Sequence, residues 1–163
     1  MELQFSIIIP VYNRPNEIDE LLHSLDLQSF QKKFEIVIVE DGSTQKSDTI
    51  VEKYQDKLSI KYFFKENSGA SASRNFGMQN ATGNYFIILD SDVLVPTQYL
   101  EELETVLTKN YTDAYGGADA AHSSFTSIQK AINYSMTSLF TTGGIRGSKN
   151  SVCLLYTSDA ADE

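Results

Sequence analysis

The sequence predicts an α/β fold in which a mostly parallel sheet carries helices on both faces, and which is incomplete at its C-terminal end. Two observations predict this class. Four apolar runs rich in β-branched and aromatic residues occur within the first 90 residues, as expected for buried strands. Segments with apolar residues three and four positions apart separate these runs, and they have the length of the crossover helices that parallel strands need.

The first half of the pattern contains two strand–helix pairs. The apolar run at 5–9 is expected to be the first strand, and Pro15 suits the first turn of the helix after it. That helix has apolar residues at the i, i+3, i+4 and i+7 positions: Ile18, Leu21, Leu22 and Leu25. The run at 34–39 predicts the second strand, and Ser43 is placed to cap the next helix.

The second half repeats this alternation. The run at 58–64 predicts a third strand, the small-residue segment at 68–81 a helix, and the run at 84–89 a fourth strand. Thr97 is placed to cap a helix with a leucine-rich face. A further amphipathic helix is expected at about 123–140.

The composition is that of an ordinary globular domain, with 41% hydrophobic and 21% charged residues among 163. No apolar run approaches the roughly 20 residues of a membrane span, and the N-terminus lacks the basic start of a signal peptide. The net charge of −9, without a basic stripe, argues against a nucleic-acid partner. One cysteine gives no disulfide framework, so we expect a cytoplasmic protein; peripheral association with the inner face of the membrane stays open.

Residues 153–163 are expected to be foreign to the fold. Their back-translation resembles the transposon-end adapter used in sequencing libraries, so the reading frame is expected to run off a fragment into adapter DNA. The domain is then expected to occupy residues 1–152. The alternative is a short genuine strand followed by a tail.

Polar residues follow the expected strands at their carboxyl ends, where open parallel sheets bind ligands. Asp90 and Asp92 follow the fourth run, and in extended chain both carboxylates would face one spot. At roughly 5 Å and an effective dielectric near 20, they would repel by about 3 kcal/mol. A bound cation, a protonated carboxyl or a turn that splays the two side chains apart would offset this repulsion.

The resemblance to a known family rests on four stretches: "SIIIPVYNRP", "FEIVIVEDGST", "NSGASASRNFG" and "ATGNYFIILDSD". As a set, over about residues 4–107, they resemble the family 2 glycosyltransferases, which implies a Rossmann-like sheet of the GT-A type. Glu40 departs from the family, which usually has the first aspartate of a D-D-G-S turn there. The second aspartate, here Asp41, is the one implied to contact the nucleotide base.

The resemblance also implies a donor site. Its implied nucleotide-sugar-binding residues are Pro10, Tyr12, Asn13, Asp41, Asn67, Arg74, Asn75, Asp90 and Ser91. Asp90 and Asp92 are the implied ligands of Mg²⁺ or Mn²⁺. The implied donor is a UDP-sugar.

The implied reaction is sugar transfer, with inversion, to a hydroxyl of a bacterial polysaccharide or glycoconjugate, with a glycan or lipid-linked acceptor as partner. We expect the catalytic base beyond residue 163, so the chain alone is expected to be inactive; Asp119 and His122 are weaker candidates. Two alternatives remain: a nucleotide-sugar-binding module without catalysis, and a haloacid-dehalogenase-type phosphatase. Leu94 stands where that phosphatase motif wants threonine or valine.

Overall fold

The computed structural model describes residues 2–114 and residue 127. The chain divides into two compact units, Met1–Thr108 and Lys109–Glu163, and the sheet lies in the first. The elements alternate along the chain: β1 (Phe5–Val11), α1 (Pro15–Asp26), β2 (Glu35–Asp41), α2 (Asp48–Glu52), β3 (Ser59–Lys65), α3 (Ala70–Asn80), β4 (Tyr85–Ile88) and α4 (Tyr99–Lys109).

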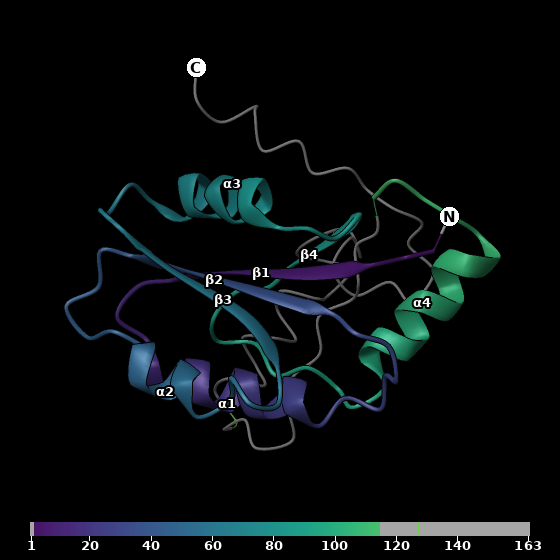
Figure 1. Ribbon diagram of the computed structural model, residues 1–163, viewed down its shortest axis with the longest axis horizontal. Helices are drawn as coiled ribbons and strands as arrows, with labels where there is room; N and C mark the ends of the chain where they lie inside the picture. Colours follow the sequence, from purple (N-terminus) through teal and green to yellow (C-terminus); the bar gives the residue numbers. More distant parts are fainter. Residues whose placement is uncertain (1, 115–126, 128–163) are drawn as a thin grey trace. The chain divides into compact units, whose positions relative to one another are not determined.

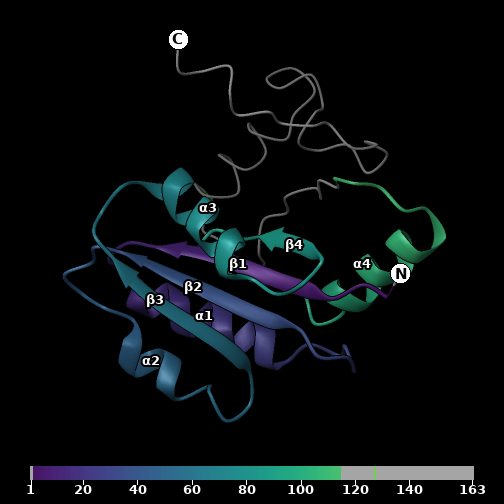
Figure 2. The ribbon, with the colours of Figure 1, turned by 45° about the horizontal axis from the view of Figure 1, so that its top comes forward.

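Within the described residues the strands form one parallel sheet in the order β3-β2-β1-β4. Ile7 on β1 pairs with Ile36 on one side and with Ile87 on the other. Helices α1 and α2 cover one face of the sheet and α3 covers the other (Figures 1 and 2). This arrangement confirms the predicted α/β class with helices on both faces of a parallel sheet.

The two faces of the sheet carry separate apolar cores. The larger core joins the sheet to α1 and α4, and its centre includes Ile9, Leu22 and Leu100, all fully buried. The smaller core lies between the sheet and α3 around Ile8. Gly77 allows α3 to approach this closely, because a Cβ atom there would lie 2.5 Å from the Ile8 Cγ2 atom.

The helix cap predicted at Ser43 is wrong. Helix α2 begins at Asp48, five residues after Ser43, and the Ser43 hydroxyl instead accepts a hydrogen bond from the Asn13 backbone N–H. Helix α4 begins at Tyr99, two residues after Thr97, and the cap predicted at Thr97 stays a prediction. At Ser43, a long-range contact between loops therefore took up the hydroxyl that the local sequence assigned to a helix end.

Several predictions fall on residues that the structure does not describe. These are the amphipathic helix at 123–140, the candidate bases Asp119 and His122, and the foreign tail at 153–163. They stay predictions. Among the residues that are described, no helix is both long enough and apolar enough to cross a membrane.

Candidate functional site

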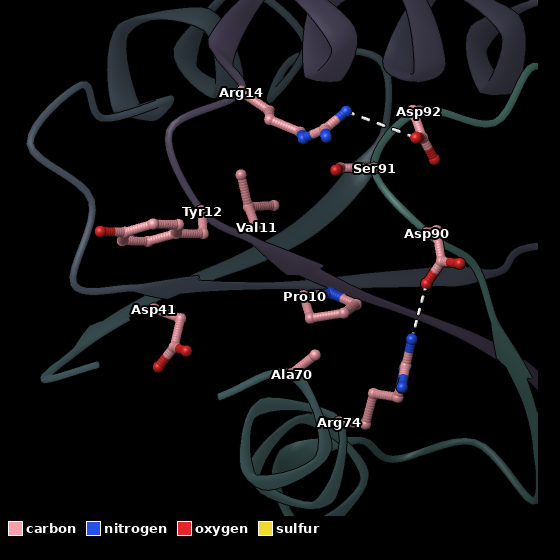
Figure 3. A pocket seen from close by; sticks show the side chains of 10 residues that line it. All are labelled: Pro10, Val11, Tyr12, Arg14, Asp41, Ala70, Arg74, Asp90, Ser91 and Asp92. Carbon is pink, nitrogen blue, oxygen red and sulfur yellow. Dashed lines mark hydrogen bonds and ion pairs between the residues drawn. The ribbon is translucent and has the colours of Figure 1, made fainter. Parts of the chain in front are cut away.

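A cleft of about 290 Å³ opens at the carboxyl ends of β1, β2 and β4 and at the start of α3 (Figure 3). It is lined by Pro10, Val11, Tyr12, Arg14, Asp41, Ala70, Arg74, Asp90, Ser91 and Asp92. Six of the predicted donor-site residues and the second predicted metal ligand therefore lie around one cavity. Open parallel sheets bind their ligands in the crevice beyond the carboxyl ends of the strands, and this cleft lies there.

The first wall of the cleft comes from the end of β1 and the loop after it. Tyr12 is 53% exposed, so most of its ring is available to a ligand. Asn13 does not line the cleft. It has a left-handed backbone (φ 55°), and its side-chain oxygen accepts hydrogen bonds from the backbone N–H groups of Thr44 and Gln45. Asn13 thus ties the β1–α1 loop to the β2–α2 loop.

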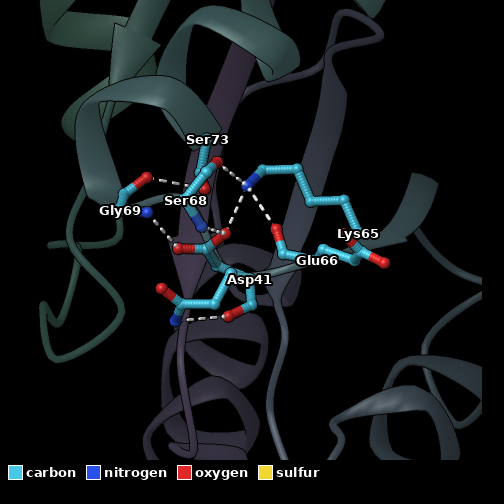
Figure 4. A network of polar contacts seen from close by, with 7 residues as sticks. Asp41, Lys65, Glu66, Ser68, Gly69 and Ser73 are labelled. Carbon is cyan, nitrogen blue, oxygen red and sulfur yellow. Dashed lines mark hydrogen bonds and ion pairs between the residues drawn. The ribbon is translucent and has the colours of Figure 1, made fainter.

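Asp41, the last residue of β2, is buried and its carboxylate is held by a network of donors (Figure 4). Lys65 pairs with its Oδ1 atom, the Ser68 backbone N–H donates to the same atom at 2.9 Å, and the Gly69 N–H donates to Oδ2 at 2.8 Å. Burial opposes ionisation of Asp41, but these donors outweigh it and hold the pKa of the carboxyl below its ordinary value. The structure therefore presents an ionised, fixed acceptor beside the cleft.

Asn67 supports Asp41 rather than lining the cavity. Its side-chain amide donates to the Asp41 backbone carbonyl at 2.9 Å. Gly42 is required beside it, because its φ is +73° and a Cβ atom there would lie 2.7 Å from the Asn67 backbone nitrogen. Asn75 is exposed on α3 and does not line the cleft.

Asp90 and Asp92 line the same cleft but do not converge as predicted. Strand β4 ends at Ile88, so the two carboxylates lie in a turn and not in extended chain. Asp90 Oδ1 pairs with Arg74 Nη2 of α3 at 2.7 Å, and Asp92 Oδ2 pairs with Arg14 Nη1 of the β1–α1 loop at 3.3 Å. The expectation of one shared spot is corrected: the two carboxylates are directed to opposite walls, each beside an arginine (Figure 3).

Three residues that line the cleft were not predicted, Val11, Arg14 and Ala70, and Arg14 is the charged one among them. It follows Asn13 directly, in the loop after the first strand, so its place at a strand end was the available signal. Its partner lies 78 positions away in the sequence, which no local pattern reveals.

The carboxylates of the cleft fit a hard divalent cation that also binds the phosphate oxygens of a ligand. Mg²⁺ sites of this kind use one or two carboxylates, with phosphate oxygens and waters as the other ligands. Asp90 and Asp92 supply two largely exposed carboxylates at one cavity. The described residues contain no cluster of three or more histidine, cysteine, aspartate or glutamate side chains able to hold a metal.

Comparison with known proteins places the chain in a family. The chain is 42% identical, over 106 residues, to an uncharacterized glycosyltransferase of Rickettsia conorii. The aligned segment covers 65% of this chain and 17% of that protein. It is 38% identical over 114 residues to the poly(ribitol-phosphate) beta-N-acetylglucosaminyltransferase TarS of Staphylococcus aureus, covering 68% of this chain and 20% of TarS.

Solved structures of glycosyltransferases are also similar to this chain. The complex of S. aureus TarS with UDP-GlcNAc matches with a TM-score of 0.66 and 34% identity, over 74% of this chain and 38% of that one. The mannosyltransferase PcManGT of Pyrobaculum calidifontis, in complex with GDP-Man and Mn²⁺, matches with a TM-score of 0.58 and 25% identity, over 66% and 32% of the two chains.

The chain spans between 17% and 32% of the length of the first curated relatives that it matches. The model of the family described as Glycosyl transferase family 2 matches residues 6–159. The strand order, the cleft and this match agree, and the chain belongs to glycosyl transferase family 2.

Proposed function

We propose that this domain binds a UDP-sugar and a divalent cation in the cleft, as the donor half of an inverting hexosyltransferase. The acceptor in this proposal is a hydroxyl of a bacterial polysaccharide or glycoconjugate. The observation that carries the proposal is the cleft itself, which brings a fixed carboxylate, Asp41, to the same cavity as the Asp90–Asp92 turn. The UDP-GlcNAc complex of TarS supports the donor class.

The nucleotide end of the donor belongs at the Asp41 wall. An ionised carboxylate accepts hydrogen bonds and cannot donate one, so Asp41 can accept the N3–H of uracil. Asp41 Oδ2 accepts one hydrogen bond within the described structure and has capacity for another. The exposed Tyr12 ring and half-buried Pro10, on the neighbouring wall, offer apolar surface to the base or the ribose.

The diphosphate belongs at the Asp90–Asp92 wall. A divalent cation would supply charge neutralisation as the diphosphate leaves, and Asp90 and Asp92 are the residues that would hold it. Arg74 adds a fixed positive charge from α3, and its buried Nε–H has no hydrogen-bond partner within the described residues. A phosphate or ribose oxygen would satisfy that donor. The mannosyltransferase complex with Mn²⁺ supports the choice of cation.

The catalytic base is proposed to lie outside the described residues. Each carboxylate that lines the described part of the cleft already pairs with a positively charged side chain: Asp41 with Lys65, Asp90 with Arg74 and Asp92 with Arg14. A general base must accept a proton from the acceptor hydroxyl, and a carboxylate oxygen that already holds a positively charged side chain is less accessible to that hydroxyl. This observation also favours the second candidate, a nucleotide-sugar-binding module without catalysis. The family assignment leaves the phosphatase alternative without support.

A coupled assay for UDP release tests whether the catalytic base lies within the 163 residues. The chain would be incubated with a panel of UDP-sugars and Mn²⁺, with and without oligosaccharide and lipid-linked acceptors. We expect nucleotide binding without acceptor-dependent release. Robust acceptor-dependent release would mean that the base lies within these 163 residues and would direct the search to Asp119 and His122.

A further inference from the structure

We propose that Arg14 is a donor-site residue that exchanges partners: it pairs with Asp92 in the free protein and with the donor's diphosphate once a divalent cation binds Asp92. This inference rests on the proposed function, because it takes a nucleoside diphosphate and a divalent cation as the ligands of the cleft. It concerns the one cleft arginine that comes from the β1–α1 loop.

The Arg14–Asp92 contact has the properties of a pair that can be exchanged. Nη1 and Oδ2 are 3.3 Å apart, longer than the roughly 2.7–2.9 Å of a strong charge-assisted hydrogen bond. The side chains are 48% and 57% exposed, so water screens the attraction. The neighbouring Arg74–Asp90 pair, at 2.7 Å, is the tighter of the two. Arg14 is therefore the arginine whose release would cost less.

Arg14 and a divalent cation compete for the same carboxylate. The guanidinium already lies against Asp92 Oδ2, and a cation bound to that carboxylate would place like charges side by side. A divalent cation attracts the carboxylate more strongly than a half-exposed guanidinium does, so the guanidinium leaves. The affinity of Asp92 for the cation is therefore lowered by the free energy that the Arg14–Asp92 ion pair contributes in the free protein.

The released guanidinium has two candidate partners. One is Glu17, whose half-buried side chain has its Oε1 atom 3.7 Å from Arg14 Nη1. The other is the diphosphate, whose oxygens match the planar fork of arginine. Charge balance favours the diphosphate. A UDP-sugar brings about two negative charges and the cation two positive ones, so Asp92 is left with an uncompensated charge unless Arg14 stays in the cleft.

The experiment compares Arg14→Gln and Arg14→Lys with the unsubstituted chain and with Lys53→Gln. Lys53 is a matched control, since it forms a similarly exposed pair with Asp19 at 3.7 Å and does not line the cleft. Mn²⁺ binding without nucleotide is followed by electron paramagnetic resonance. Binding of UDP and of uridine at saturating Mn²⁺ is followed by calorimetry, after circular dichroism has shown that each variant is folded.

For Arg14→Gln we expect Mn²⁺ alone to bind about two- to fivefold more tightly, the size of an exposed ion pair. UDP should bind about tenfold more weakly, the size of a lost charge-assisted contact, while uridine binding is unchanged. Arg14→Lys should recover part of the UDP affinity because it keeps the charge but not the fork. Lys53→Gln should change none of these quantities.

Three results would overturn the exchange. Unchanged Mn²⁺ affinity in Arg14→Gln would mean that the arginine does not compete for Asp92. Unchanged UDP affinity would mean that the released side chain goes to Glu17. Equal losses for UDP and uridine would mean that Arg14 acts on the loop rather than on the diphosphate. Failure of the unsubstituted chain to bind UDP at all would instead refute the proposed function, and the exchange with it.

Discussion

Asp41→Asn is the substitution that separates nucleotide recognition from loop anchoring. It removes the charge that pairs with Lys65, whose side chain is 17% exposed, and it replaces one acceptor oxygen by an N–H₂ group that faces a backbone donor. Breaking a buried pair by removing one charge typically costs about 3–5 kcal/mol. Because Lys65 keeps the Ser68 hydroxyl and the Glu66 carbonyl as acceptors, we expect a smaller loss, about 2–3 kcal/mol of unfolding free energy.

The loss in binding is expected to be separate from the loss in stability. An amide at position 41 no longer offers a fixed, ionised acceptor to the base, so UDP affinity per folded molecule should fall about tenfold, with or without Mn²⁺. Glu35→Gln is the matched control, because Glu35 is a buried carboxylate at the other end of the same strand. It should lose stability and keep UDP affinity.

The assays are urea denaturation followed by circular dichroism, and calorimetric titration of UDP at a concentration where each variant is folded. If Asp41→Asn loses stability but binds UDP as the unsubstituted chain does, Asp41 is only an anchor for the loop after β3. If its stability is also unchanged, the network around Asp41 does not hold the loop.

Three further predictions concern the fold. Burial opposes ionisation of Glu35, but hydrogen bonds from Lys61, Ser6 and Thr82 outweigh it and lower its pKa from 4.5 to about 2, so this carboxylate stabilises the fold above about pH 4.5 and loses that effect as the pH falls toward 2. Glu35→Gln should therefore lower the free energy of unfolding by about 2–3 kcal/mol at pH 7 and by much less near pH 2. In a series of denaturation experiments at decreasing pH, the variant should show a smaller loss of stability on the acid side than the unsubstituted chain. Gly77→Ala should destabilise the fold by about 1–2 kcal/mol in urea denaturation, since the overlap with Ile8 outweighs the roughly 1 kcal/mol gain in helix propensity; an increase in stability would show that α3 can shift freely. Deleting residues 153–163 should leave the melting temperature within about a degree, and a clear decrease would mean that this segment packs as a genuine strand.

The sheet could be predicted because its information is local. Each strand is a short apolar run, each helix has its own periodicity, and βαβ connections favour parallel neighbours. The carboxyl ends of such strands meet at one edge, so Pro10, Tyr12, Asp41 and Asp90 could be assigned to one cleft before their geometry was known.

The partners of the polar side chains could not be predicted in the same way. Ser43 looked like a helix cap, but the Asn13 backbone reaches it across the sheet edge. Arg14 reaches Asp92 from a loop far away in the sequence, and β4 ends before Asp90, which removes the extended geometry assumed for the two aspartates. These contacts depend on where loops meet in space, which periodicity does not encode.

We propose that the cleft binds a nucleoside diphosphate through a cation held by Asp90 and Asp92. The most direct test of this proposal is calorimetric titration of UDP into the 163-residue chain with Mn²⁺ and with EDTA, repeated for Asp92→Asn. We expect clear binding with Mn²⁺, much weaker binding with EDTA, and loss of most of the difference in Asp92→Asn, because a neutral amide is a poor ligand for a hard cation. Equal UDP affinity with Mn²⁺ and with EDTA would contradict it.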